Sequence, residues 1–265
     1  MPSVLISDID GTLLYKSEVT PEPVTRALDD FQKAGNLLGL CTGRAVQGCQ
    51  TLIDALPPLT LPSIFFGGAL IWDTGKRKAL KSMPCDQSIL EVVQAIFEAY
   101  PSVSITLNTE REGWTLRTNK ILQTKGVLYD RSSPLITTLP DRKQQILKVL
   151  LTDENPEILT EIKLTLLDPT LFHGVFASRH FFEITDSKVN KGTAIENLFH
   201  LVPQMEEYKV WAAGDAPSDA MMKPYVDAFA APVDAHPTVL SVADVTFPSA
   251  KEEGICQFLS SLKTQ

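Results

Sequence analysis

Near its N-terminus the chain reads Val4-Leu5-Ile6-Ser7-Asp8-Ile9-Asp10-Gly11-Thr12. The apolar run predicts a buried strand, and the Gly-Thr pair predicts a turn directly after it. Side chains two residues apart point to the same side of a strand, so Asp8 and Asp10 should converge where this strand ends. Open α/β sheets bind their ligands at the carboxyl ends of the strands. The stretch therefore predicts an α/β protein with an acidic site at that edge.

The two carboxylates are difficult to explain as structural residues. Like charges at the end of an apolar strand repel each other and lose solvation unless a cation or a reaction requires them. Strongly perturbed carboxylates cluster at functional sites. We therefore interpret Asp8 and Asp10 as functional residues.

The composition excludes several classes of protein. The chain has 265 residues, enough for one large or two modest domains, and its hydrophobic content of 44% favours a packed core over disorder. A formal net charge of −8 argues against a nucleic-acid or membrane-surface binder, because both need basic patches. The four cysteines are scattered, and neither a signal peptide nor a bilayer-spanning run is visible. We expect reduced thiols and a cytoplasmic location.

Strand and helix signals alternate along the first third of the chain. Thr20 is a good N-cap residue and Pro21 suits a first helical turn, so a helix should begin there. A second helix is predicted over residues 45–56. Buried strands are predicted at residues 4–6, 37–41 and 63–66. This β-α-β-α-β order implies a parallel sheet with right-handed crossovers.

The pattern changes near Pro84 and reverts after Lys191. Between these points an amphipathic helix and Thr-rich alternating strands predict an α+β module inserted into the parallel-sheet domain. The fold class is therefore α/β, with a Rossmann-like parallel-sheet core and an inserted α+β domain. We place the first part of the core at residues 1–83, the insert at 84–186 and the second part of the core at 187–265.

Four groups of polar residues fall at predicted strand ends or helix starts: Asp8 with Asp10, Thr42-Gly43-Arg44, Lys191-Gly192, and Gly214-Asp215 with Asp219. Each of the last three alone is ordinary turn or capping chemistry. Together with the first they predict a site that handles phosphate. Asp8 and Asp215 would supply the hard oxygen ligands that Mg²⁺ prefers. Lys191 would add positive charge and restrain Asp8, while Thr42 and the Gly43 amide would bind phosphate oxygens.

The whole set resembles the haloacid dehalogenase superfamily of phosphatases. The residues that carry the resemblance are Asp8-x-Asp10-Gly11-Thr12, Thr42-Gly43-Arg44, Asn190-Lys191-Gly192 and Gly214-Asp215-x-x-x-Asp219. The large insert between the second and third motifs is similar to the Cof-type, subfamily IIB branch, which implies a cap domain of the C2B type. The resemblance covers nearly the whole chain, and its first and fourth motifs are the specific ones.

The resemblance implies a role for each residue. Asp8 would attack phosphorus and form an aspartyl-phosphate, and Asp10 would act as the acid and then the base. Mg²⁺ would be held by Asp8, the Asp10 main-chain carbonyl and Asp215, and Asp219 would orient its water shell. The residues expected to contact the substrate are Gly11, Thr42, Gly43, Arg44, Lys191 and Ser218, although Arg44 could instead only hold its loop in place.

The chain departs from the family pattern at a few positions. Ser218 stands where the family usually has Asn before the last Asp, Gly67-Gly68-Ala69 replaces Asn-Gly-Ala, and Asp234 replaces a later Asn. These departures affect the expected substrate range more than the reaction type. In the insert, candidates for reading the substrate are Trp114, Arg117, Arg179, His180 and Phe181, which could equally be structural or solvated.

The function implied is a Mg²⁺-dependent phosphatase for small phosphorylated metabolites, with sugar phosphates as the expected class. Two alternatives remain open at this point. A phosphosugar mutase of the same superfamily would return the phosphoryl group to a second hydroxyl, and a non-catalytic protein would only bind the phosphometabolite. The expected partner is a small phosphorylated metabolite, with no nucleic acid and no membrane, and the oligomeric state is unknown.

Overall fold

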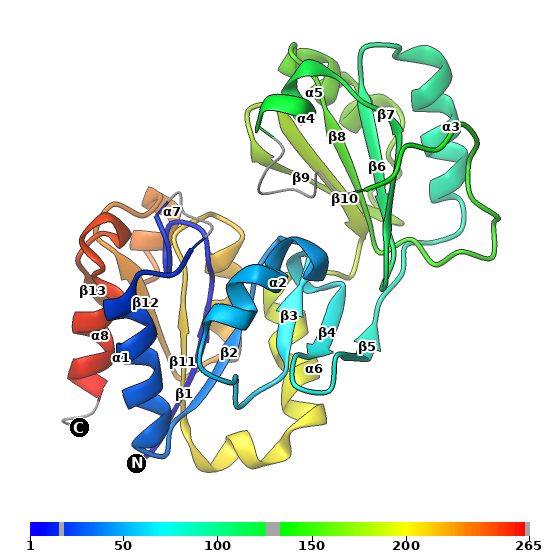
Figure 1. Cartoon of the computed structure of the whole chain (residues 1–265). Coiled ribbons are helices and arrows are strands. Elements are labelled where there is room, and N and C mark those ends of the chain that lie inside the picture. The colour runs from blue at the N-terminus through cyan, green and yellow to red at the C-terminus, as the bar shows by residue number, and fades with distance from the viewer. Residues whose placement is uncertain (16–18, 126–132, 263–265) are drawn as a thin grey trace. The chain divides into compact units, whose positions relative to one another are not determined.

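The computed structural model describes residues 1–15, 19–125 and 133–262, and the chain divides into two compact units (Figure 1). The core unit comprises residues 1–42 and 49–81 and the chain from residue 190 onward. The cap unit comprises residues 82–189 together with the short segment 43–48. The predicted domain boundaries lie between residues 83 and 84 and between residues 186 and 187. The boundaries between the two units lie between residues 81 and 82 and between residues 189 and 190. The sequence did not predict that residues 43–48 group with the cap unit.

The core unit is built on a parallel sheet whose strand order is β13-β12-β11-β1-β2. β1 lies between β11 and β2, and all five of its residues are buried. The strands are β1 (Ser3–Ser7), β2 (Leu37–Leu40), β11 (Lys209–Ala213), β12 (Ala228–Pro232) and β13 (Val245–Phe247). A parallel bridge between Cys41 and Ile64 adds β3 (Ser63–Phe65) beyond β2. The predicted parallel α/β sheet is therefore confirmed.

The core helices are α1 (Glu22–Lys33), α6 (Lys191–Leu201), α7 (Pro237–Leu240) and α8 (Ile255–Leu262), together with α2 (Val46–Ala55) from residue 49 onward. Short 3₁₀ turns are η1 (Phe66–Gly68), η3 (Pro203–Glu207), η4 (Asp219–Tyr225) and η5 (Ala250–Glu252). Helices α1 and α8, from opposite ends of the chain, lie side by side (Figure 1). No helix in the described ranges combines the length and apolar character that a membrane span requires.

The predicted start of the first helix is wrong by one residue. Pro21, not Thr20, is the N-cap residue of α1, and the buried Thr20 hydroxyl makes no hydrogen bond within the described residues. A Thr20 cap would need an N–H donor from the second or third helical residue. The third would be Pro23, which has no N–H, so this cap would lose one of its two possible donors.

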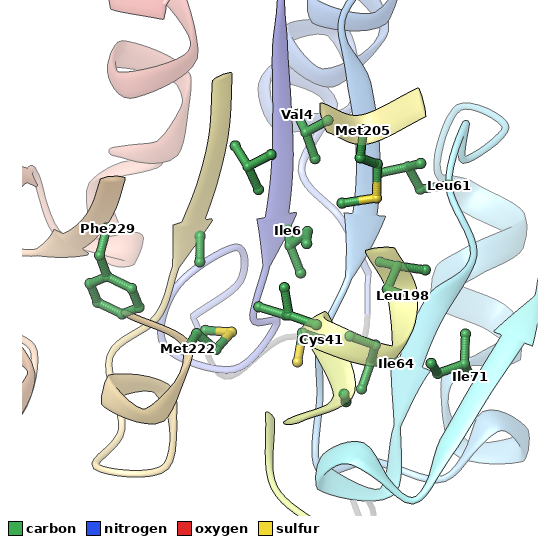
Figure 2. Packing of buried hydrophobic residues seen from close by; sticks show 14 of the residues in the cluster. Val4, Ile6, Cys41, Leu61, Ile64, Ile71, Leu198, Met205, Met222 and Phe229 are labelled. Atoms are coloured by element: carbon green, nitrogen blue, oxygen red, sulfur yellow. The ribbon is translucent and has the colours of Figure 1, made fainter. Parts of the chain in front are cut away.

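Apolar side chains from distant parts of the chain fix α6 against the core sheet. Val4 and Ile6 of β1 belong to one buried cluster with Leu198 of α6, Met205 and Met222 (Figure 2). Because α6 begins at Lys191, this packing also fixes the position of the Lys191 backbone relative to β1.

The contact between α6 and η4 requires a glycine at position 192. A Cβ there would lie 2.2 Å from the Met221 carbonyl oxygen and 2.7 Å from the Tyr225 ring. We expect Gly192→Ala to lower the free energy of unfolding by about 1–3 kcal/mol, as overpacking typically does. Urea denaturation would measure the change.

Gly48 in α2 provides the matched control. An added Cβ at Gly48 meets no atom within 4 Å, so Gly48→Ala should stabilise by roughly 0.5–1 kcal/mol through helix propensity. Equal effects of the two substitutions would contradict the close approach of α6 and η4.

An antiparallel ribbon follows β3 in the core unit. β3 pairs with β4 (Leu70–Asp73), and β5 (Lys78–Ser82) completes the strand order β3-β4-β5. Neither β4 nor β5 is predicted from the sequence, because both strands are short. In addition, β5 carries two lysines and has no fully buried residue, so it lacks the apolar run of a buried strand. Between β3 and β4, Gly68 has a φ of +122°, and a Cβ there would lie 2.5 Å from the Asn190 carbonyl oxygen.

The cap unit is an antiparallel sheet with helices, in the strand order β7-β6-β8-β10-β9. Its strands are β6 (Ser104–Asn108), β7 (Gly113–Arg117), β8 (Lys148–Thr152), β9 (Phe172–Ser178) and β10 (Phe181–Asp186). Its helices are α3 (Ile89–Ala99), α4 (Lys120–Lys125) and α5 (Pro156–Thr165). The predicted α+β character is confirmed, although the sequence analysis does not locate β8, β9 or α4.

The two faces of the cap sheet differ in character. Residues such as Ile105 of β6 and Val149 of β8 pack in one apolar cluster with Val93 of α3. Alternate residues carry polar side chains that are nevertheless buried, among them Thr106 and Lys148. The Thr-rich alternation in the sequence therefore reflects a sheet with one apolar face and one face that mixes buried polar side chains with a small apolar cluster containing Leu150 and Phe181.

Candidate active site

Asp8 directly follows β1 and continues its ladder. The Asp8 N–H donates to the Ala213 carbonyl oxygen at 2.8 Å, which joins the start of the Asp8 segment to the end of β11. The chain then turns back sharply, with the Gly11 N–H donating to Leu14 O at 2.8 Å. Gly11 has a φ of +85°, a conformation that glycine adopts readily. The turn thus places the Asp8 and Asp10 stretch at the carboxyl edge of the sheet.

Lys191 joins two carboxylates from distant parts of the chain. Its Nζ lies 2.7 Å from Asp8 Oδ1 and 2.5 Å from Asp219 Oδ1. The three side chains are only 5% (Lys191), 7% (Asp8) and 0% (Asp219) exposed. Asn190 precedes the helix and forms a capping box with Thr193, so the first turn of α6 is fixed where Lys191 emerges. The site therefore holds one ammonium between two carboxylates, away from water.

Burial and charge act in opposite directions on this cluster. The neighbouring Asp219 and Asp8 carboxylates hold the pKa of Lys191 well above its usual range, although burial alone would lower it. Burial raises the pKa of Asp8, and the Lys191 ammonium offsets this only in part. With one cation for two carboxylates, the fully ionised cluster carries an excess negative charge, which favours an added cation.

Asp215 and Asp219 are positioned by the loop after β11. Asp219 Oδ2 accepts hydrogen bonds from the N–H groups of Asp215 at 3.1 Å and Ala216 at 2.8 Å. Thr12 Oγ1 donates to Asp215 Oδ1 at 3.0 Å, which joins this loop to the stretch after β1. A Cβ at Gly11 would lie 2.3 Å from Asp215 Oδ2, so glycine is also needed for the close approach.

The acidic residues fit a divalent cation. One oxygen from each of Asp8, Asp215 and Asp219 lies within 4.8 Å of the others. Carboxylate oxygens are ligands that Mg²⁺ prefers. Both oxygens of Asp219 already accept hydrogen bonds, from Lys191 and from the loop N–H groups, which leaves Asp8 and Asp215 as the better candidates for direct ligands.

Asp215 gives the site a pH dependence that can be tested. Burial, with the Asp219 charge as a second cause, raises the pKa of Asp215 to about 6. A raised carboxyl pKa in the folded state means that the metal-free protein should lose stability as pH rises from about 4 past 6. A cation that binds ionised Asp215 should therefore stabilise the fold more at pH 7.5 than at pH 5.

Thermal unfolding with and without MgCl₂ at these two pH values would measure the effect. Asp215→Asn should reduce the pH-dependent part of the stabilisation, and Asp8, whose pKa burial also raises, should account for what remains. An equal magnesium-induced shift of the wild-type melting temperature at both pH values would contradict the assignment.

The other predicted site residues are distributed over both units. Asp10 is partly exposed and forms a backbone bridge with Leu14. Thr42 is buried in the core unit, where its N–H donates to Ile64 O and its carbonyl accepts from Gly67 N–H, both at 2.9 Å. Gly43 and the buried Arg44 belong to the segment 43–48 of the cap unit.

The structure shows a local role for one of the departures from the family pattern. Asp234 Oδ2 accepts a hydrogen bond from Ser249 Oγ at 2.7 Å, so this aspartate fastens the turn after β12 to the start of η5. Ser218 immediately precedes η4 and makes no side-chain capping bond there.

Two further side chains, those of Thr12 and Arg117, have roles in the structure that were not expected from the sequence. Thr12 belongs to the first motif but was given no role of its own, and its hydroxyl donates a hydrogen bond to Asp215. The sequence feature that could have indicated this role is a hydroxyl side chain directly after the turn glycine. Arg117, a candidate for reading the substrate, instead donates to the carbonyls of Tyr100 and Phe97 at 2.7 Å and lies over the Phe97 ring. Arg117 is therefore structural.

Comparison with known proteins gives the family. Residues 5–259 match the family described as haloacid dehalogenase-like hydrolase. The chain belongs to this family. It is 26% identical to the Bacillus subtilis protein YxeH, which is named as a candidate phosphatase, over 99% of this chain and 98% of YxeH. It is 25% identical to a second B. subtilis protein, the 5-amino-6-(5-phospho-D-ribitylamino)uracil phosphatase YwtE, over 81% of this chain and 82% of YwtE.

Solved structures agree on the fold. TM0651 from Thermotoga maritima superposes with a TM-score of 0.85 at 19% identity and covers 98% of this chain and 97% of its own. A haloacid dehalogenase-like hydrolase from Bacteroides thetaiotaomicron superposes with a TM-score of 0.83 at 17% identity, over 99% and 100% of the two chains. The predicted family and fold class, a parallel-sheet core with an inserted cap, are confirmed, and this haloacid dehalogenase-like hydrolase is an enzyme of the phosphatase type.

Proposed function

We propose that this hydrolase removes phosphate from small phosphorylated metabolites, sugar phosphates above all, by a Mg²⁺-dependent route through an aspartyl-phosphate on Asp8. The observation that carries the proposal is the buried Asp8 carboxylate, held at 2.7 Å by Lys191 and grouped with Asp215 and Asp219. A nucleophile, a fixed cation and a place for a metal ion are the components that phosphoryl transfer needs.

In the first half-reaction Asp8 is the nucleophile. A carboxylate oxygen of Asp8 forms a bond to phosphorus while the bond from phosphorus to the substrate's ester oxygen breaks. Asp10 gives its proton to that departing oxygen, which leaves as an alcohol. Lys191 remains protonated, because the two carboxylates keep its pKa high, and stabilises the charge around the Asp8 oxygens.

In the second half-reaction Asp10 acts as a base. It takes a proton from a water molecule whose oxygen attacks the phosphorus of the aspartyl-phosphate. The bond between Asp8 and phosphorus breaks, inorganic phosphate forms and the Asp8 carboxylate is restored. Asp10 is protonated again and ready for the next substrate, so the cycle closes without a further reactant.

The remaining groups of the proposal bind the metal and the phosphate. Mg²⁺ would be held by Asp8, the Asp10 main-chain carbonyl and Asp215, and Asp219 would orient its water shell. When bound, it offsets the repulsion between the Asp8 carboxylate and the phosphate dianion. The phosphate ligands in the proposal are Gly11, Thr42, Gly43, Arg44, Lys191 and Ser218.

The substrate class is supported by a relative. The compound in the name of YwtE carries its phosphate on a ribityl group, which is a polyol. Sugar phosphates share that arrangement of a phosphate ester beside hydroxyl groups.

The test is a phosphate-release assay on a panel of sugar phosphates and one aryl phosphate, with MgCl₂ and with EDTA. We expect Mg²⁺-dependent release of inorganic phosphate. Formation of an isomeric sugar phosphate without free phosphate would indicate a mutase instead. Binding of substrates without turnover of any of them would indicate a non-catalytic binding protein.

A further inference from the structure

A second buried ion pair lies in the cap unit, apart from the acidic cluster. Lys148 Nζ on β8 is 2.7 Å from Glu183 Oε1 on β10. The two side chains are 3% and 8% exposed. β8 and β10 are antiparallel neighbours in the cap sheet, so the pair joins two adjacent strands.

Lys148 has another acceptor that lies far away in the sequence. Its Nζ donates to the Gly43 carbonyl oxygen, also at 2.7 Å. A Cβ added to Gly43 would contact Glu183 Oε2 at 3.6 Å, so both members of the pair lie beside this backbone. Gly43 opens the segment 43–48 of the cap unit, directly after Thr42.

Neither a gain in fold stability nor the electrostatic attraction of an anion explains well why Lys148 and Glu183 are buried as a pair. Desolvating two ions costs several kcal/mol each, and apolar residues of similar volume often replace such a pair without loss. The charges of Lys148 and Glu183 cancel, so the pair adds little net field for an anion. What the pair does provide is a fixed ammonium, aimed at one backbone carbonyl.

That carbonyl belongs to the peptide that links Gly43 to Arg44. Glycine has unusually permissive backbone dihedrals, so a hydrogen bond from a distant side chain restricts this peptide more than it would at another residue. The peptide before it is already anchored, because Thr42 O accepts from Gly67 N–H at 2.9 Å. Lys148 anchors the peptide after it, which carries the Arg44 N–H. A cation on the carbonyl also polarises that peptide.

We propose that Lys148, oriented by Glu183, is a positioning residue for phosphate binding: it fixes the Gly43–Arg44 peptide that binds the substrate's phosphoryl group. The inference rests on the proposed function, which includes Gly43 and Arg44 among the phosphate ligands. It assigns to Lys148 an effect on phosphate affinity, which every substrate shares.

The double variant Lys148→Met/Glu183→Leu tests the proposal without leaving one buried charge unpaired. We expect its melting temperature to stay near that of the wild type. Its inhibition constant for inorganic phosphate and its KM should each rise about tenfold, because phosphate binding would then have to order a backbone residue that Lys148 otherwise holds in place. The KM increase should be the same for an aryl phosphate and a hexose phosphate, and kcat should change less.

Two further variants sharpen the comparison. Glu183→Gln keeps the Lys148 ammonium and its bond to Gly43, so its phosphate affinity should lie between those of the wild type and the double variant. Lys33→Met removes an exposed lysine that pairs with Asp29 on α1, and it should change none of these constants.

A folded double variant whose phosphate inhibition constant stays within about twofold of the wild type would overturn the proposal while the proposed function stands. A KM increase for one substrate only would also overturn it, because Lys148 would then recognise the leaving group. If the wild type shows neither turnover nor Mg²⁺-dependent phosphate binding by calorimetry, the proposed function fails, and this inference fails with it.

Discussion

Replacing Asp8 with asparagine should reduce phosphate release by about 10⁴-fold or more, the scale seen when a covalent nucleophile is removed. The amide has nearly the same shape but is a far weaker nucleophile, and it cannot pair as an anion with Lys191 at 2.7 Å. Burial raises the pKa of Asp8, so the native carboxylate is costly to ionise and its loss should not unfold the protein. Phosphate release with saturating MgCl₂ and an unfolding curve would together measure the effect.

Asp29→Asn is the matched control for this substitution. Asp29 lies on α1 and forms an exposed pair with Lys33, so the same chemical change there should leave turnover unaltered. Retention of more than about a tenth of wild-type turnover by Asp8→Asn would contradict the nucleophile assignment.

Replacing Lys191 with methionine should impair both stability and turnover. The substitution leaves the carboxylates of Asp8 and Asp219 buried without their shared ammonium. Removing one partner of a buried ion pair typically costs about 3–5 kcal/mol of unfolding free energy. Turnover should also fall steeply, because the charge beside the attacking carboxylate is lost. Urea denaturation and phosphate release would measure the two effects separately.

The unpaired charge left by Lys191→Met should make the stability of this variant depend on pH and on a second substitution. In Lys191→Met the carboxylates should bind protons in place of the ammonium, so the loss of stability should shrink as pH falls. Lys191→Met/Asp219→Asn removes one of the unpaired charges and should recover part of the stability, but not the turnover. A loss below about 1 kcal/mol in the single variant at pH 7.5 would contradict the account.

Local sequence signals predicted the parts of the fold that they determine. The run before Asp8, the apolar stretches of β2 and β11 and the alternation with helices sufficed for a parallel core with an inserted cap. For the site, the stretches that carry Asp8 and Asp215 both follow parallel strands, and Lys191 begins a helix that packs against that sheet. The structure brings these three residues together with Asp219.

The features that were missed depend on contacts between distant residues. Thr20 has an ideal side chain for a helix cap, yet Pro23 removes one of the N–H groups that it would bond. From the sequence alone, Lys148 in β8 would be predicted to be solvent-exposed. Its partners Glu183 and the Gly43 carbonyl lie 35 and 105 residues away in the sequence, so only the folded structure shows that it is buried. The grouping of residues 43–48 with the cap unit has the same cause.

The most direct test of the central claim is to trap the phosphorylated enzyme. The protein would be mixed with a phosphate ester and MgCl₂, quenched in acid within one turnover and digested for mass spectrometry. We predict a phosphoryl group on the peptide that contains Asp8, and none in Asp8→Asn. Rapid release of phosphate by the wild type with no phosphorylated peptide, or with the phosphoryl group on another residue, would contradict covalent catalysis by Asp8.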